Sequence, residues 1–180
     1  HMLYRPIGYL VRQGVAALGI GGGLVPILQA LTAIFGALGL GFAYLALESL
    51  TANRTIAIWT SLALGVSWSY WTLSTDVYYF SLSAMFVAAT LALFLRAESG
   101  WSFVLCGVLC SLSILTCQAN IVLLPGLGFA IAIREPSDRT RSFRRIALLW
   151  GAAGAIVGSA FLGAGVLIYG QRSIPALVKW

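Results

Sequence analysis

The sequence predicts an all-α fold, a polytopic transmembrane helical bundle with about six spans and one interfacial helix. Of its 180 residues, 60% are hydrophobic and only 9% are charged, and the mean hydropathy is +0.94. A soluble domain of this size could not bury so many apolar side chains in one core. Several apolar runs also approach or exceed the roughly 20 residues that a helix needs to cross about 30 Å of hydrocarbon.

Polar breaks divide the apolar sequence into successive helices of what we treat as one transmembrane domain, residues 1–180. The segment 4–18 is short and carries Arg5 and Arg12, so we expect an interfacial helix there. The glycine-rich segment 19–23 ends it. The predicted spans follow at about 24–50, 55–73, 77–95, 101–116, 119–133 and 146–169.

The apolar run 101–133 is too long for one ordinary helix. Polar residues interrupt it at 117–120, so we predict two short helices with a turn near Gln118. Pro125 offers an alternative, because a proline inside a helix could instead kink the second one. We expect Gln118 and Asn120 to satisfy the backbone of the turn, with substrate contact as the other reading.

Charges predict the orientation of the bundle. If the loops alternate sides, seven arginines share one side: Arg54, Arg96, Arg134, Arg139, Arg141, Arg144 and Arg145. Four cations share the other: Arg5, Arg12, Arg172 and Lys179. The excess of seven over four predicts that the first side is cytoplasmic. Four of the five acids also fall on that side, and Asp76 alone faces out.

Asp76 lies among aromatic residues in the segment 69–82, "SYWTLSTDVYYFSL". One interpretation is structural: its carboxylate caps the span that begins at Val77, and the tyrosines and tryptophans form an interfacial belt. The other is functional, and the two can coexist, because a capping carboxylate can still present its second oxygen to a substrate.

Three stretches carry a resemblance to a known family: residues 1–11, 28–47 and 67–96. The first has the pattern H-x-L-Y-x-P, matched by His1, Leu3, Tyr4 and Pro6. The last has the pattern W-x-x-x-x-x-(E/D)-x-Y, matched by Trp71, Asp76 and Tyr78. In this order the motifs resemble the N-terminal half of GT-C superfamily membrane glycosyltransferases, of the family-39-like and DUF2723 type, relatives of protein O-mannosyltransferases. The likeness covers residues 1–133.

The resemblance implies a GT-C-like bundle in the cell envelope, in the bacterial inner membrane, with its active face extracytoplasmic. It implies transfer of a sugar from a polyprenyl-phosphate donor to an acceptor that the sequence does not identify. Such chemistry needs a carboxylate as general base and cations that stabilise the departing phosphate. The residues indicate no cofactor, and the resemblance leaves a divalent metal open.

By this resemblance Asp76 is an auxiliary catalytic acid and His1 a catalytic or donor-contacting residue. Substrate-binding candidates are Tyr4, Arg5, Tyr78, Gln118 and, with no motif behind it, Arg172. The family's principal catalytic acid would precede His1. We therefore expect the chain to be an internal fragment, inactive by itself, of a longer glycosyltransferase, with His1 and Met2 either native or left from cloning.

One departure from the family pattern is Cys117, which stands where related sequences often carry a histidine. A neutral thiol replaces imidazole as a base or cation near neutral pH only when it is strongly activated, so this departure weighs against a catalytic role for the turn. Cys106 and Cys110 are four residues apart and are predicted to pack rather than to bind metal or form a disulfide. The net charge of +6 follows topology, so we expect no nucleic-acid partner.

Two other functions remain open. A transporter or permease would place broken helices and ionisable residues near mid-membrane, whereas the predicted spans are nearly free of charge there. A membrane assembly subunit without chemistry of its own is the third reading, since the main catalytic acid is not in the sequence.

Overall fold

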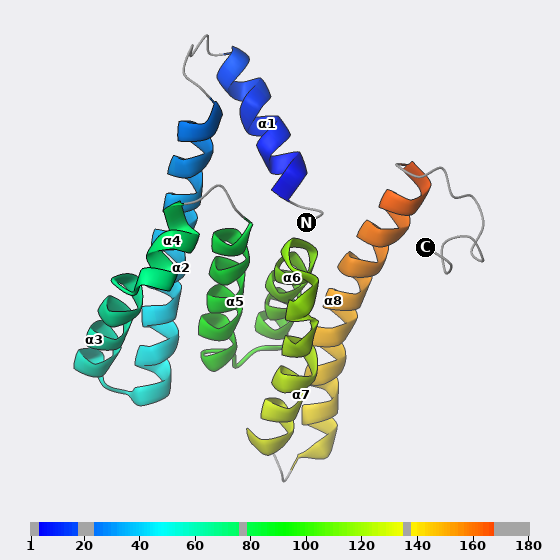
Figure 1. Ribbon diagram of the computed structural model, residues 1–180. Coiled ribbons are helices and arrows are strands. Elements are labelled where there is room, and N and C mark those ends of the chain that lie inside the picture. Colours follow the sequence, from blue (N-terminus) through cyan, green and yellow to red (C-terminus); the bar gives the residue numbers. More distant parts are fainter. Residues whose placement is uncertain (1–3, 18–23, 76–78, 135–137, 168–180) are drawn as a thin grey trace.

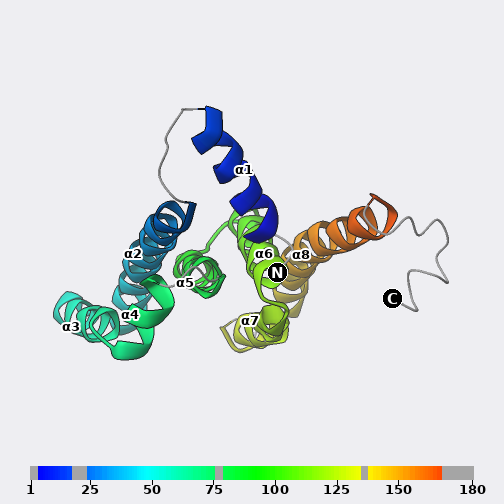
Figure 2. The same cartoon turned by 45° about the horizontal axis from the view of Figure 1, so that its top comes forward.

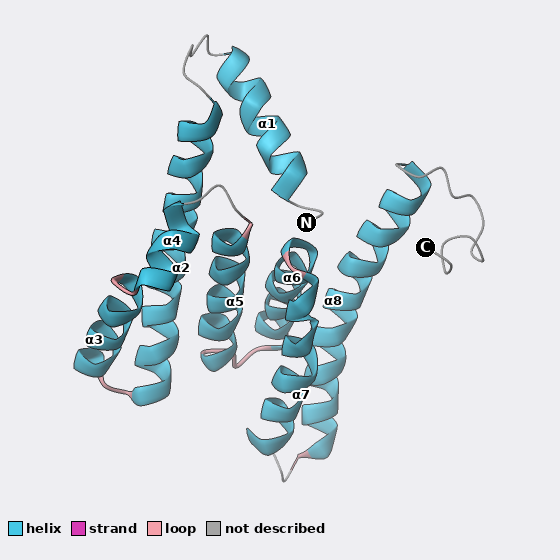
Figure 3. Cartoon of the chain, in the orientation of Figure 1, coloured by secondary structure: helices cyan, strands magenta, loops and turns pink. Residues whose placement is uncertain are grey.

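The computed structural model describes residues 4–17, 24–75, 79–134 and 138–167. Every element in these ranges is a helix (Figures 1 and 3). In chain order they are α1 (Tyr4–Ala17), α2 (Leu24–Thr51), α3 (Arg54–Gly65), α4 (Trp68–Thr75), α5 (Phe80–Leu95), α6 (Gly100–Thr116), the 3₁₀ helix η1 (Gln118–Val122), α7 (Leu123–Arg134) and α8 (Arg139–Leu167). The predicted all-α fold class is therefore confirmed for the described residues.

Within the described residues, two helices have the length and composition to cross a membrane, over Val25–Thr51 and Arg139–Ala164. With 28 residues in α2 and 29 in α8, they are about 42 and 44 Å long at about 1.5 Å per residue. The apolar helices Phe80–Leu95, Gly100–Thr116 and Gln118–Arg134 are shorter. In Figure 1, α2 and α8 extend past the ends of α5 and α6.

The helices form a chain of neighbours in which α5 is central. It packs against α2 on one side and α6 on the other, and α6 packs against α8. Figure 2 shows α5 between α2 and α6, with α3 and α4 on the outer side of α2. Helix α7 packs against α8. The group of α2, α3 and α4 therefore lies on one side of α5, and the group of α6, α7 and α8 lies on the other.

The core lies where α5, α6, α7 and α8 meet. It contains Phe94, Ala97, Phe103, Cys106, Leu127, Ile131 and Leu149. The Phe94 and Phe103 rings meet edge to face with centroids 6.2 Å apart, a favoured aromatic geometry. Cys106 and Cys110 are buried free thiols, in agreement with the predicted packing role.

A helix break divides the segment 55–73, for which the sequence predicts a single span. Helix α3 ends at Gly65 and α4 begins at Trp68. The Ser67 hydroxyl donates to the carbonyl oxygen of Leu64 at 2.7 Å and accepts from the backbone N–H of Tyr70 at 3.3 Å. Ser67 is thus the N-cap of α4, which begins as a helix separate from α3.

The chain also turns between α6 and α7, near the position that the sequence predicts. Helix α6 ends at Thr116, and η1 begins at Gln118. Pro125 lies in the first turn of α7, where its missing N–H breaks no helical hydrogen bond. The helix break at Cys117, and not a proline kink, therefore divides the apolar run 101–133 into two helical segments.

Candidate functional site

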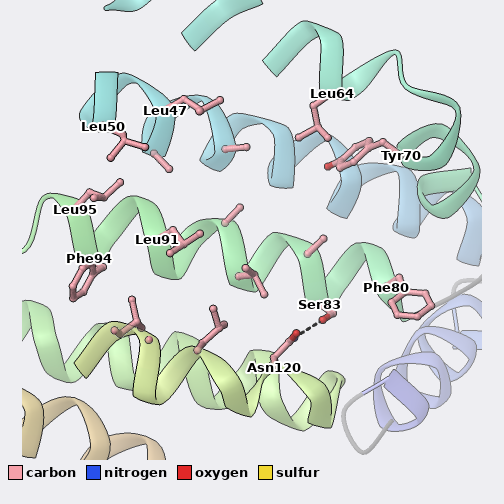
Figure 4. A pocket seen from close by; sticks show the side chains of 18 of the residues that line it. Leu47, Leu50, Leu64, Tyr70, Phe80, Ser83, Leu91, Phe94, Leu95 and Asn120 are labelled. Atoms are coloured by element: carbon pink, nitrogen blue, oxygen red, sulfur yellow. Dashed lines mark hydrogen bonds between the residues drawn. The ribbon is translucent and has the colours of Figure 1, made fainter. Parts of the chain in front are cut away.

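An apolar groove lies between several of the described helices. It has a volume of about 990 Å³, at the upper end of the roughly 300–1,000 Å³ of small-molecule sites. Its walls come from α2 to α5, from η1 and from α7. Figure 4 shows it along α5, with α2 on one side and η1 and α7 on the other.

Most of the groove is lined by aliphatic side chains. Helix α2 contributes Ala43, Ala46, Leu47 and Leu50, α5 contributes Ala84, Val87, Ala88, Leu91 and Leu95, and α7 contributes Leu123, Leu127 and Ala130. Not one of the described lining residues is Asp, Glu, His, Lys or Arg. The described lining is therefore suited to contact an apolar chain.

Polar side chains gather at one end of the groove, which we call the Asn120 end. They are Tyr70, Ser74, Ser81, Ser83 and Asn120. The opposite end is lined by Leu50, Phe94 and Leu95 (Figure 4). The groove is thus amphipathic along its length, polar at the Asn120 end and apolar at the other.

A hydrogen-bonded cluster of Asn120, Ser83 and Ser113 lies at the Asn120 end. The Asn120 amide nitrogen donates one hydrogen to the Ser83 hydroxyl oxygen at 2.7 Å. Its second hydrogen is shared between the hydroxyl oxygen of Ser113 at 2.6 Å and the carbonyl oxygen of Ser113 at 3.2 Å. Asn120 therefore satisfies the last turn of α6, as predicted. Its own carbonyl oxygen accepts no hydrogen bond from the described residues, and so it can receive one from a ligand.

Tyr70 and Ser81 hold α4 against the groove. The Tyr70 hydroxyl donates to the carbonyl oxygen of Gly36 at 2.5 Å, and the Ser81 hydroxyl donates to that of Leu73 at 2.6 Å. A Cβ at Gly39 would lie 2.9 Å from the Tyr70 hydroxyl oxygen, so glycine there permits the approach. These contacts connect α4 to both α2 and α5.

An ion pair and further arginine contacts mark the opposite end of the bundle, which we call the Arg96 end. Arg96 lies 3.1 Å from the Glu48 carboxylate and donates to the Ser49 hydroxyl at 2.8 Å. Arg145 donates to the carbonyl oxygen of Glu98 at 2.8 Å. Residues that the charge pattern assigned to one side of the bundle therefore meet at one end of it.

The sequence-predicted site residues fall mostly outside this geometry. His1, Asp76, Tyr78 and Arg172 lie outside the described residues. Tyr4 and Arg5 begin α1, where their side chains are also outside the description. Gln118 opens η1, is exposed and does not line the groove. The described part of the chain contains no group of three or more His, Cys, Asp or Glu residues that could hold a metal ion.

The sequence pattern does not identify Tyr70 and Ser83, which line the groove, or Ser113, which bonds to Asn120. Each bonds to a residue 7 to 37 positions away, so no local pattern identifies the pair. The one signal was the concentration of serines in the apolar segments 81–83 and 111–113, because serine in a buried helix needs a hydrogen-bond partner.

No protein-family model, curated protein or solved structure matches the chain.

Proposed function

We propose that this chain is part of an integral-membrane glycosyltransferase that uses a polyprenyl-phosphate sugar at the extracytoplasmic face, and that the groove holds the donor's isoprenoid chain. The amphipathic groove carries the proposal. A polyprenyl phosphate combines a long apolar chain with one polar head, and the groove offers an aliphatic channel with hydroxyl and amide groups at one end.

The proposed orientation agrees with this use. The Arg96 end holds the arginine-rich loops, which the positive-inside rule assigns to the cytoplasm. The Asn120 end would then face outward, and the donor's head would lie at the outer surface. Helices α2 and α8 support membrane insertion by length and composition. In this proposal the shorter helices complete a bundle of about six spans.

The groove supplies binding, not chemistry. With no ionisable group except Tyr70 among its described lining, it needs a carboxylate from another part of the protein. Asp76, in the segment between α4 and α5, is our candidate for an auxiliary acid. The proposed phosphate contacts are His1 and Arg5, in keeping with the family resemblance, and Arg172, which matches no motif of that family.

The proposal can be tested with a photoreactive, benzophenone-bearing polyprenyl phosphate and the full chain in lipid nanodiscs. We expect crosslinks on α5 and α7, and we expect unlabelled polyprenyl phosphate to compete more strongly than phosphatidylglycerol. Ala88→Trp places an indole in the groove and should reduce crosslinking at least about fivefold, because it occupies the site of the chain.

Ala155→Trp is the matched control, because Ala155 is exposed on α8, away from the groove. Its crosslinking should equal that of the unmodified chain. Crosslinks spread evenly over all helices, or equal competition by the two lipids, would contradict a polyprenyl site and favour a permease or an assembly subunit.

A further inference from the structure

A corner formed by the end of α7 and the start of α8 concentrates positive charge. Between 134 and 145 the sequence has five arginines and two acids, a net charge of +3. Arg134, Arg139, Arg141 and Arg144 are exposed. The Asp138 carboxylate accepts from the backbone N–H of Arg141 at 2.9 Å. It therefore caps α8 and stabilises the positive end of the helix dipole.

Arg145 differs from its neighbours, because its guanidinium is committed to the fold. It is only 6% exposed, donates to the carbonyl oxygen of Glu98 and lies 4.9 Å from the centre of the Phe103 ring. This contact ties the start of α6 to the second turn of α8. Gly100 is also close to α8, since a Cβ there would lie 3.3 Å from Leu148.

Two exposed aromatic side chains lie near the arginines: Phe143 is within the arginine cluster, and Trp101 follows Gly100, which lies beside Leu148 one turn past Arg144. Phe143, on α8, is 74% exposed and Trp101, in the first turn of α6, is 70% exposed. Phe143 follows Arg139 by four residues, so the two share one flank of the helix. Exposed aromatics beside cations, at the start of a long apolar helix, are typical of the level where a membrane's headgroups meet its hydrocarbon.

We propose that Arg134, Arg139 and Arg144 form a binding surface for the phosphate groups of anionic phospholipids, with Phe143 and Trp101 inserted at the acyl boundary. The occupant follows from charge complementarity and from position. The patch continues directly into the apolar length of α8, so the cations face the headgroups of the leaflet in which that helix begins. Nucleic acid is disfavoured, because the exposed aromatic side chains described near the arginines lie at the start of a long apolar helix.

This surface is independent of sugar transfer and of the groove, and it requires only that α8 enters a membrane. Each arginine near a charged bilayer strengthens binding by about fivefold. Removing two of them should therefore weaken the preference for anionic lipid by at least about tenfold.

The test uses the purified full chain in zwitterionic detergent, with equal amounts of dioleoyl phosphatidylglycerol and dioleoyl phosphatidylcholine added. Native mass spectrometry measures how much of each lipid is retained. We expect the unmodified chain to retain more phosphatidylglycerol than phosphatidylcholine. In Arg139→Gln/Arg144→Gln, the ratio of retained phosphatidylglycerol to phosphatidylcholine should fall by at least about tenfold. Circular dichroism checks that the variant keeps its helix content.

Arg12→Gln/Arg54→Gln is the charge-matched control, since both side chains are exposed on other helices. It should retain phosphatidylglycerol within about twofold of the unmodified chain, because detergent offers no charged bilayer surface and neither arginine belongs to the proposed binding surface. Arg139→Lys/Arg144→Lys keeps the charge and should retain most of the preference. The proposal is overturned by equal losses in the two glutamine variants, by no preference in the unmodified chain, or by a single-stranded DNA oligonucleotide that displaces the lipid.

Discussion

Asn120 in η1 donates a hydrogen bond to the Ser83 hydroxyl of α5 across 2.7 Å, although the two residues are 37 positions apart. The same amide reaches Ser113 at the end of α6. One side chain thereby joins three helices at the polar end of the groove. The position of that end depends on this cluster.

Asn120→Ala should destabilise the protein by about 1–2 kcal/mol, because it leaves the buried hydroxyls of Ser83 and Ser113 without their donor. The free energy of unfolding in a denaturing-detergent titration measures the change. Gln118→Ala is the control two residues away: it removes an exposed side chain and should change stability by less than about 0.5 kcal/mol. Equal effects of the two substitutions would show that the cluster contributes nothing.

Gly107→Ala should force α6 and α8 apart. An added Cβ would overlap the carbonyl oxygen of Leu149 and lie 2.9 Å from the Ala152 Cβ. A backbone oxygen cannot rotate out of the way as the end of a flexible side chain can. We therefore expect the free energy of unfolding to fall by about 1–3 kcal/mol. Gly154→Ala on α8 meets nothing within 4 Å and should be neutral or stabilising by up to about 1 kcal/mol. Thermal unfolding of both variants compares the two sites, and a neutral Gly107→Ala would disprove the close packing.

Tyr70→Phe removes the hydroxyl that connects α4 to the Gly36 carbonyl. We expect α4 to open more often, with backbone amide exchange in 68–75 about fivefold faster, which corresponds to a lost hydrogen bond of about 1 kcal/mol. Hydrogen exchange with mass spectrometry reads this segment directly. Tyr44→Phe loses a hydroxyl that bonds within its own helix, to Glu48, and should leave exchange in α4 unchanged. The connection would be refuted if both variants behaved alike.

The proposed orientation predicts labelling from opposite sides of the membrane. In a chain whose three cysteines are replaced by alanine, Asp76→Cys and Gln118→Cys should react with an impermeant maleimide in intact cells. Arg141→Cys should react only after the membrane is permeabilised, because the arginine-rich loop is assigned to the cytoplasm. The reverse pattern would overturn the topology and, with it, the outward Asn120 end.

Asp76→Asn should lower sugar transfer from a polyprenyl-phosphate donor in the complete protein by about tenfold. This is less than the roughly 10²–10⁴-fold contribution of a principal general base, as befits an auxiliary acid. Product formation at saturating donor measures the loss, and helix content shows that the protein still folds. Glu98→Gln removes an exposed acid at the opposite end and should not change turnover. Undiminished transfer by Asp76→Asn would leave this residue only a capping role.

The composition and polar breaks of the sequence predicted an all-helical protein, a turn near Gln118 and a common end for the charged residues around Arg96. These features can be predicted because they depend on the length of apolar runs, on the polar residues between them and on the number of arginines in each loop. None of these depends on which helices pack together. The sequence also placed its main chemical candidates at His1, Asp76, Tyr78 and Arg172, which lie outside the described residues and stay predictions.

Tertiary structure alone decided where the groove lies and which residues lie at its polar end. The break at Ser67 turns α4 toward α2, because Tyr70 finds its acceptor at Gly36, 34 residues away. The hydroxyls of Ser83 and Ser113 become a polar end only when Asn120 approaches both. A buried hydroxyl or amide must find a partner somewhere, and the sequence states that requirement without naming the partner, which only the packing of the helices supplies.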